Sequence, residues 1–159
     1  RLLSRGLGDV YKRQGCSIAA VGAKNPSVDQ LLKAAIPGLP KVILHHPVLS
    51  VTAGDEFIES YHKAKQGKLG APYVVLYEGS VADESIAEKF GGYWSAMGTE
   101  ESNDGTHQPI PTAKWLNDLA PEAAAVVAVG TCATWGGIPA AAGNVTNSMS
   151  VMDLSLIHI

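Results

Sequence analysis

The chain has 159 residues, of which 46% are hydrophobic, and is long enough to enclose one hydrophobic core. Its net charge of −3 argues against nucleic acid as the main ligand, because no cluster of basic residues is available to neutralise phosphates. No run of about 18 apolar residues is present, so no segment is predicted to span a membrane. Charged residues make up only 17%, which indicates a surface covered in part by a partner. The two cysteines form no disulfide framework and predict a reducing, cytoplasmic setting.

The two ends of the chain differ in pattern from the part between them. Residues 1–14 follow no continuous period, residues 154–159 stop in mid-pattern, and both resemble translated adapter sequence. We therefore predict a non-native segment over 1–14, one native domain over 15–153 that is truncated on both sides, and a non-native tail over 154–159.

Helix and strand signals alternate between these ends. Ser27 and Gln30 form a capping-box pattern for a helix that ends near Pro37, and apolar spacing predicts a helix from Asp55 to about Gly67. The remaining predicted elements are strands before Cys16 and over 41–46, 71–77 and 125–129, a helix over 112–119, and an irregular insertion over 91–111. This alternation predicts an α/β fold with a flavodoxin-like parallel sheet and helices on both faces.

Three short segments follow predicted strands and therefore fall on one edge of the predicted sheet. They are Gly15–Cys16–Ser17, Glu78–Gly79–Ser80 and Gly130–Thr131–Cys132. Open α/β sheets build their sites at the carboxyl ends of strands, so two thiols and a carboxylate are expected to converge there. Either cysteine alone is equally well explained as a small buried apolar residue, and Glu78 alone as a solvated or helix-capping residue. The two cysteines together favour ligands of a metal or cluster, or a nucleophile.

His45 and His46 end the predicted strand over 41–46. Neighbouring strand residues point to opposite faces, so both cannot bind one ion, and we expect satisfied, partly buried histidines. Three further aromatic residues are expected to contact the core or a partner rather than to carry chemistry; they are Trp94, Trp115 and Trp135.

Three motifs carry a specific resemblance to a known family. The sequences GCS at 15–17, YEGS at 77–80 and GTCATWGGIPAA at 130–141 resemble the small subunit of NiFe hydrogenases. The sequences IAAVG at 18–22 and PKVILHHP at 40–47 are similar to its actinobacterial-type, high-affinity branch. The resemblance covers 15–153 in order, as an N-terminal fragment of such a subunit. The 20-kilodalton subunit of NADH:quinone oxidoreductase is an alternative with the same fold, but it has adjacent cysteines where this chain has Gly15–Cys16.

The resemblance implies a proximal iron–sulfur cluster of the 4Fe-4S type. Cys16 matches the second cysteine of a Cys-x-x-Cys pair and Cys132 matches the third ligand, whereas Arg13 stands where the first is expected. The fourth belongs to a Gly-Cys-Pro motif that this chain does not reach. Glycine-rich loops around Gly130 and Gly136 would let the backbone approach the sulfurs. The other cofactor-binding residues expected from the resemblance are Gly15 and Thr131.

The same resemblance implies electron transfer within a larger assembly during H2 oxidation. The nickel–iron centre would belong to a large subunit in an obligate heterodimer or a higher oligomer, and this chain would pass electrons to a downstream acceptor. Membrane association would come only through partners. Glu78 is expected to take part in proton transfer, and the apolar segments 93–97 and 135–139 are expected to face the large subunit.

A cysteine-nucleophile enzyme similar to amidotransferases is an alternative of a different class. Cys132 would attack, with His45 or His46 as the base. The nucleophile-elbow pattern requires glycine two residues after the nucleophile, where this chain has Thr134. A phosphate- or flavin-binding module is a further alternative, but the chain has no glycine-rich phosphate-binding motif.

Overall fold

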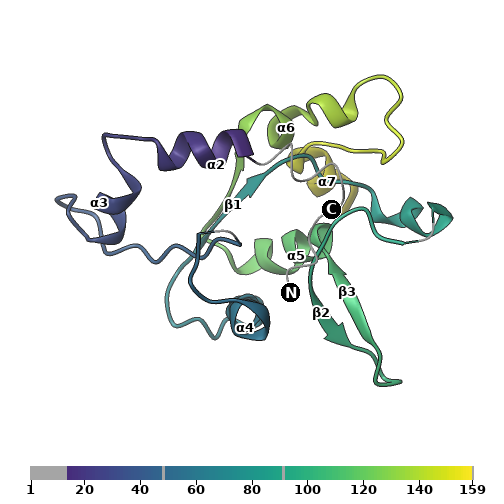
Figure 1. The fold of residues 1–159 in the computed structure, drawn as a ribbon, viewed down its shortest axis with the longest axis horizontal. Coiled ribbons are helices and arrows are strands. Elements are labelled where there is room, and N and C mark those ends of the chain that lie inside the picture. The colour runs from purple at the N-terminus through teal and green to yellow at the C-terminus, as the bar shows by residue number, and fades with distance from the viewer. Residues whose placement is uncertain (1–13, 48, 91, 159) are drawn as a thin grey trace.

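The computed structural model describes residues 14–47, 49–90 and 92–158 (Figure 1). Its α-helices are α2 (Gln14–Val21), α3 (Val28–Leu32), α4 (Gly54–Lys65), α5 (Thr112–Leu119), α6 (Gly130–Trp135) and α7 (Val151–His158). Its strands are β1 (Val74–Glu78), β2 (Ala96–Glu101), β3 (His107–Pro111) and β4 (Ala125–Val129). Three short 3-10 helices cover Glu84–Phe90, Ala120–Glu122 and Ile138–Ala140.

The central sheet is a parallel pair of strands. β1 and β4 lie in register, with Val74 opposite Ala125 and Glu78 opposite Val129. β4 consists only of alanine and valine, and β1 is apolar apart from its last residue, Glu78, which is the composition typical of parallel strands. The predicted α/β fold with a parallel sheet is confirmed, and the strand predicted over 125–129 has the observed bounds of β4.

One face of this sheet is covered and the other is not. Tyr77 of β1 packs in a core with Leu116 of α5 and with residues from α6 and α7; these are Ala133, Val151 and Leu154. Side chains along a strand alternate between the two faces of the sheet, so Val74 and Leu76 of β1 lie on the face opposite Tyr77. On that face Leu76 is 64% exposed, and Val74 and Val127 are exposed as well. The described residues therefore leave an apolar sheet face uncovered.

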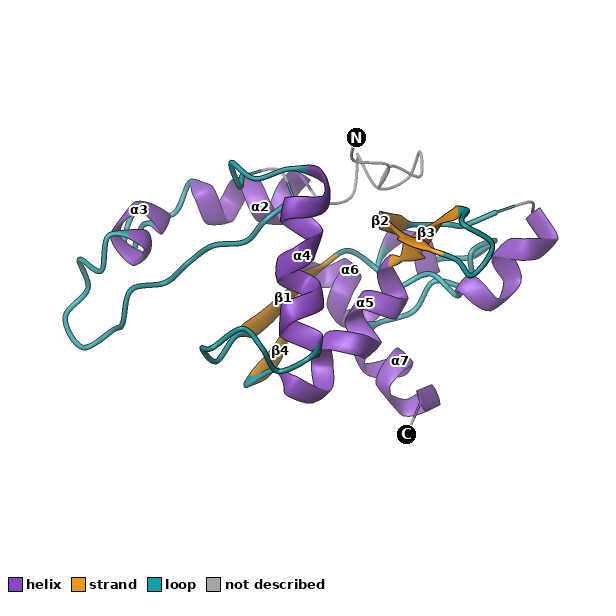
Figure 2. Cartoon of the chain, turned by 90° about the horizontal axis from the view of Figure 1, so that it is seen from below, coloured by secondary structure: helices purple, strands orange, loops and turns teal. Residues whose placement is uncertain are grey.

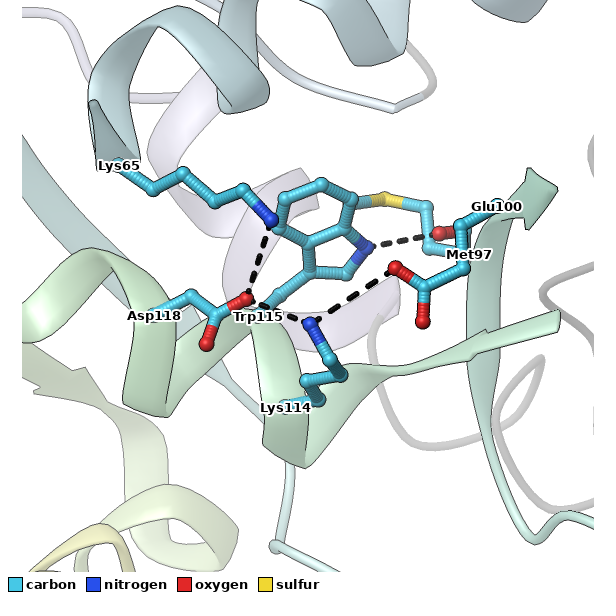
Figure 3. A network of polar contacts seen from close by, with 6 residues as sticks. All are labelled: Lys65, Met97, Glu100, Lys114, Trp115 and Asp118. Carbon is cyan, nitrogen blue, oxygen red and sulfur yellow. Dashed lines mark hydrogen bonds and ion pairs between the residues drawn. The ribbon is translucent and has the colours of Figure 1, made fainter. Parts of the chain in front are cut away.

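A second core joins α4, α5 and the β2–β3 hairpin. Trp115 lies at its centre with Ile110, Met97 and two residues of α4, Phe57 and Ile58. The Trp115 indole donates a hydrogen bond of 2.8 Å to the Met97 carbonyl, as Figure 3 shows. Trp115 of α5 packs in this second core, whereas Leu116 of α5 packs in the core against the sheet. Helix α5 therefore lies between the two cores.

Charged residues from three elements lie beside that buried indole. Lys65 of α4 lies 5.5 Å from the ring centroid and 3.4 Å from an oxygen of Asp118 (Figure 3). Lys114 lies 2.8 Å from the same oxygen and 3.9 Å from a carboxylate oxygen of Glu100 on β2. These contacts link α4, α5 and the hairpin around Trp115.

Three sequence predictions differ from the structure. Residues 41–46 form no strand; a strand needs a hydrogen-bonded neighbour, and the strand expected before Cys16 lies outside the described residues. The segment 91–111 contains the β2–β3 hairpin, because an Asp104–Gly105 turn, with Gly105 at φ +79°, reverses the chain. The helix capped by Ser27 and Gln30 is confirmed at its start but ends at Leu32, short of Pro37.

Residues between α2 and α4 extend away from the rest of the molecule. Figure 2 shows α3 and its flanking loops projecting from the body formed by α4, α5, β1 and β4. The described helices include none that is long and apolar enough to cross a membrane. The predicted segment boundaries at 14/15 and 153/154 fall inside α2 and α7, and they stay predictions.

Candidate functional site

Both cysteines lie in helices, not in the loops expected from the sequence. Cys16 is in the first turn of α2, and the strand predicted before it lies outside the described residues. Cys132 is the third residue of α6, a short helix that begins directly after β4. A helix was missed here because Gly130 and Thr131 favour a loop. Cys132 nevertheless stands at the carboxyl end of the parallel sheet, as predicted.

Two glycines leave space for the cysteine sulfurs, and one of them lies where the two cysteine segments meet. Gly130 adopts φ +83°, and a Cβ atom built on it would overlap the Cys16 sulfur. Gly137 adopts φ +58°, and its ideal Cβ position lies 2.6 Å from the Cys132 sulfur. Both positions need glycine for the left-handed backbone and for the sulfur that occupies the side-chain space. In the glycine-rich loop around Gly136, Gly137 is therefore the residue that lies against a sulfur, whereas a Cβ atom added to Gly136 would meet Ala140.

The electrostatics of Cys16 reflect this convergence. Burial raises the pKa of the Cys16 thiol, and the negative charges of Glu78 and Cys132 raise that pKa further. Both predicted partners therefore lie within electrostatic reach of Cys16. A raised pKa disfavours the free thiolate of Cys16, whereas a bound metal ion stabilises a thiolate.

Glu78 ends β1 at the same sheet edge. Its Oε2 atom accepts a hydrogen bond of 2.5 Å from the Ser17 hydroxyl. Its Oε1 atom is buried and has no hydrogen-bond partner among the described residues. A buried carboxylate oxygen without a donor is costly, which marks Glu78 as a group that awaits a further partner. Ser17 was part of the GCS motif, but its contact with Glu78 needed the three-dimensional structure.

The two histidines are half-buried and hydrogen-bonded, as predicted. His45 stacks on Phe57 at 4.1 Å between ring centroids, and its Nε2 lies 2.8 Å from the Phe57 carbonyl. The two ring nitrogens of His46 have Ser17 and the Leu49 N–H as partners, each at 3.3 Å. Neither arrangement favours a histidine acting as base for a Cys132 nucleophile.

The donor set fits part of an iron–sulfur site. Thiolates are the ligands that iron–sulfur clusters prefer, and Cys16 and Cys132 supply two where a 4Fe-4S cluster takes four. Among the described residues, no three or more histidine, cysteine or acidic side chains lie close enough together to hold a metal ion by themselves. Arg13, at the position of the expected first cysteine, lies outside the described residues. Gly15 and Thr131 are exposed, and their cofactor-binding role stays a prediction.

The surface beside Cys132 is strongly apolar. Trp135 is 78% exposed and Ile138 is 85% exposed, directly after the cysteine helix. Of the second segment expected to face a partner, Tyr93 is exposed, but Ala96 and Met97 are buried. The expectation for Ala96 and Met97 is wrong, because both side chains are buried at the start of β2, and Met97 packs in the second core against α4 and α5. Trp115 is a core residue, as expected.

The protein is of the α/β class, with parallel strands at its centre. Its candidate site consists of two thiols and a carboxylate at the carboxyl edge of these strands. The chain belongs to the family described as NADH ubiquinone oxidoreductase, 20 Kd subunit, which matches residues 14–157.

Hydrogenase small subunits are among its relatives. The structure of an actinobacterial-type NiFe hydrogenase from Ralstonia eutropha H16 is 48% identical with a TM-score of 0.79, and the match covers 89% of this chain and 39% of that chain. The periplasmic NiFeSe hydrogenase small subunit of Desulfomicrobium baculatum is 31% identical over 87% of this chain and 41% of its own length. The hydrogenase-2 small chain of Escherichia coli (strain K12) is 29% identical over 88% of this chain and 32% of its own.

These comparisons confirm the resemblance to the small subunit of NiFe hydrogenases, including its actinobacterial-type branch. They favour that interpretation over the NADH:quinone oxidoreductase subunit, although the family as a whole carries the latter's name. The chain spans about a third to two fifths of the length of the curated relatives it matches.

Proposed function

We propose that this chain is the electron-transfer part of a hydrogenase small subunit, with a proximal iron–sulfur cluster at Cys16 and Cys132. The observation that carries the proposal is the convergence of these two cysteines, far apart in sequence, at the carboxyl edge of β1 and β4. When bound, the cluster would accept and release single electrons between a nickel–iron centre in a large subunit and a downstream acceptor.

The residues of this chain have distinct roles in that proposal. The Cys16 and Cys132 thiolates hold the cluster, and two further ligands come from outside the described residues. Gly130 and Gly137 leave room for the two sulfurs, because neither has a Cβ atom. A site with little water around it strengthens the electrostatic influence of nearby groups on the cluster's potential.

Glu78 is the proposed proton-transfer residue of this site. Its Oε1 atom is buried without a hydrogen-bond partner among the described residues, and the carboxylate acts electrostatically on Cys16. The Oε1 oxygen can accept a proton from a neighbouring group and pass it on, which is the role that we propose for Glu78. We expect Glu78→Gln to lower hydrogen turnover while the iron content stays unchanged.

The assembly proposed for this chain is an obligate heterodimer with a nickel-bearing large subunit. The apolar surface formed by Trp135 and Ile138 lies beside Cys132 and is the proposed contact region. Replacing both residues by serine should weaken the complex with the large subunit. Val51 is a fully exposed apolar residue outside this surface, so Val51→Ser is the control and should leave the complex intact. If the large subunit co-purified equally with the wild-type chain, the double variant and the Val51→Ser variant, this assignment of the interface would be contradicted.

The experiment that tests the function uses the native full-length protein, purified without oxygen together with its large subunit. Iron and acid-labile sulfide are measured, and the reduced cluster is followed by electron paramagnetic resonance. We expect Cys132→Ala to abolish the signal of the proximal cluster. An unchanged spectrum in that variant would contradict the cluster assignment.

A further inference from the structure

Three polar side chains from separate segments form one hydrogen-bonded chain beside the thiol site. The His46 Nε2 atom lies 3.3 Å from the Ser17 hydroxyl oxygen, and that hydroxyl lies 2.5 Å from Glu78 Oε2. His46 belongs to the loop that leads back from α3, Ser17 to α2, and Glu78 to the end of β1. Ser17 is therefore the link between the loop and the sheet.

The direction of each hydrogen bond follows from the backbone. The Leu49 N–H donates to His46 Nδ1 at 3.3 Å, so Nδ1 is an acceptor and the proton of the neutral ring is on Nε2. Nε2 then donates to the Ser17 oxygen. The single hydroxyl proton of Ser17 remains for Glu78 Oε2, which as a carboxylate can only accept.

The His46 loop is itself held in place. The His46 backbone N–H donates to the Ser50 hydroxyl at 2.8 Å, and the Ser50 N–H donates to the His46 carbonyl at 3.0 Å. These two hydrogen bonds tie the His46 backbone to Ser50, and the His46 ring in turn contacts Ser17. The chain of contacts therefore starts at a hydrogen-bonded loop residue and ends on the carboxylate beside Cys16.

We propose that Ser17, oriented by His46, is a positioning residue that holds the Glu78 carboxylate charge beside the cluster site and leaves Oε1 to face the bound group. The proposal rests on the proposed function of the thiol pair. A negative charge beside a cluster opposes the arrival of an electron, so the arrangement lowers the cluster's reduction potential. Without the Ser17 hydroxyl, Oε2 would lose its donor, and the carboxylate would no longer be held beside the cluster site.

The test measures the midpoint potential of the proximal cluster in the full-length complex by a redox titration with electron paramagnetic resonance. Ser17→Ala should raise the potential, and Ser17→Thr, which keeps a hydroxyl, should retain the wild-type value. Glu78→Gln should raise the potential as well. Adding Ser17→Ala to Glu78→Gln should then cause no further shift, because both changes act through one carboxylate.

Ser17 is next to the cluster ligand Cys16, so Ser17→Ala could prevent the cluster from assembling. His46→Ala changes the same chain of contacts at a residue distant from Cys16 in sequence. It should shift the potential in the same direction by a smaller amount. Ser17→Ala with a wild-type potential would overturn the proposal. So would a shift from Ser17→Ala that is equally large in the Glu78→Gln background, because Ser17 would then act on the cluster directly.

Failure of the proposed function has a different signature. A full-length complex without iron would contradict the cluster assignment itself. The positioning role is then decided by the carboxyl carbon-13 chemical shift of Glu78 in the iron-free protein. A change in Ser17→Ala but not in Ser17→Thr supports the role, and the same shift in all three proteins overturns it.

Discussion

The segment from α2 to the start of α4 and the body from α4 onward are held together in different ways. Among the described residues, every buried side chain belongs to the body, from Phe57 to Leu154. The segment 14–53 instead exposes apolar residues such as Ile18 and Ile43. The body is therefore stabilised by its own cores, whereas the N-terminal segment is held by polar contacts at the site and by the stacking of His45 on Phe57.

The candidate site lies where these two regions meet. Cys16, Ser17 and His46 come from the N-terminal segment, whereas Glu78 and Cys132 come from the body. The hydrogen bond from Ser17 to Glu78 and the contact of Cys16 with Gly130 join the regions. A cluster bound by both cysteines would add a covalent link between the two regions.

The comparison is sharpest for two isoleucines of opposite burial. Ile110 is fully buried in the second core, whereas Ile43 is 85% exposed. Ile110→Ala should lower the free energy of unfolding by about 2–5 kcal/mol, and Ile43→Ala by less than about 0.5 kcal/mol. Urea unfolding followed by tryptophan fluorescence measures both. Similar losses for the two variants would show that the N-terminal segment contributes a core of its own.

A pair of glycines tests the junction between the regions. Gly130 and Gly105 have nearly the same φ, +83° and +79°, but a Cβ atom meets the Cys16 sulfur only at Gly130. Substitution by alanine should cost about 1–2 kcal/mol of backbone strain at either position. Gly130→Ala should in addition displace Cys16 and lower the iron content of the full-length complex, whereas Gly105→Ala should retain its iron. Equal iron in both variants would mean that Gly130 is needed only for its backbone conformation.

The smallest expected effect is a pH dependence confined to the body. Burial lowers the pKa of His62, and the charge of nearby Lys65 lowers that pKa further. The unfolded chain therefore binds a proton on His62 at a higher pH than the folded chain does. The contribution of His62 to the free energy of unfolding is fully present above its pKa in the unfolded chain, about 6.5. It is lost as the pH falls through the lower pKa of His62 in the folded chain. His62→Gln should flatten the stability profile below pH 6.5, and an unchanged profile would contradict this.

Local sequence signals predicted the body well. The helix over 112–119 and the strand over 125–129 have the observed bounds, because each is a strongly patterned segment that packs in the core. The hairpin was missed although its Asp104–Gly105 turn was present, since β2 and β3 contain few apolar residues. The sheet edge was correctly chosen for Cys132 and Glu78, because parallel strands end together.

The N-terminal segment was predicted less well for a physical reason. Residues 41–46 have strand propensity, but propensity forms a strand only where a neighbour completes the hydrogen bonds. The contacts of Ser17 and His46 depend on three segments meeting in space, and no spacing in the sequence encodes that. The packing of Gly137 against Cys132 likewise depends on how the chain turns after α6.

The central claim is that one cysteine from each region binds the same cluster. The most direct measurement compares iron content and paramagnetic signal in the full-length complex carrying Cys16→Ser, Cys132→Ser or both substitutions. Each single variant should lose the same proximal-cluster signal, and the double variant should lose nothing more. A normal proximal cluster in either single variant, or losses of two different signals that add up in the double variant, would contradict the shared site.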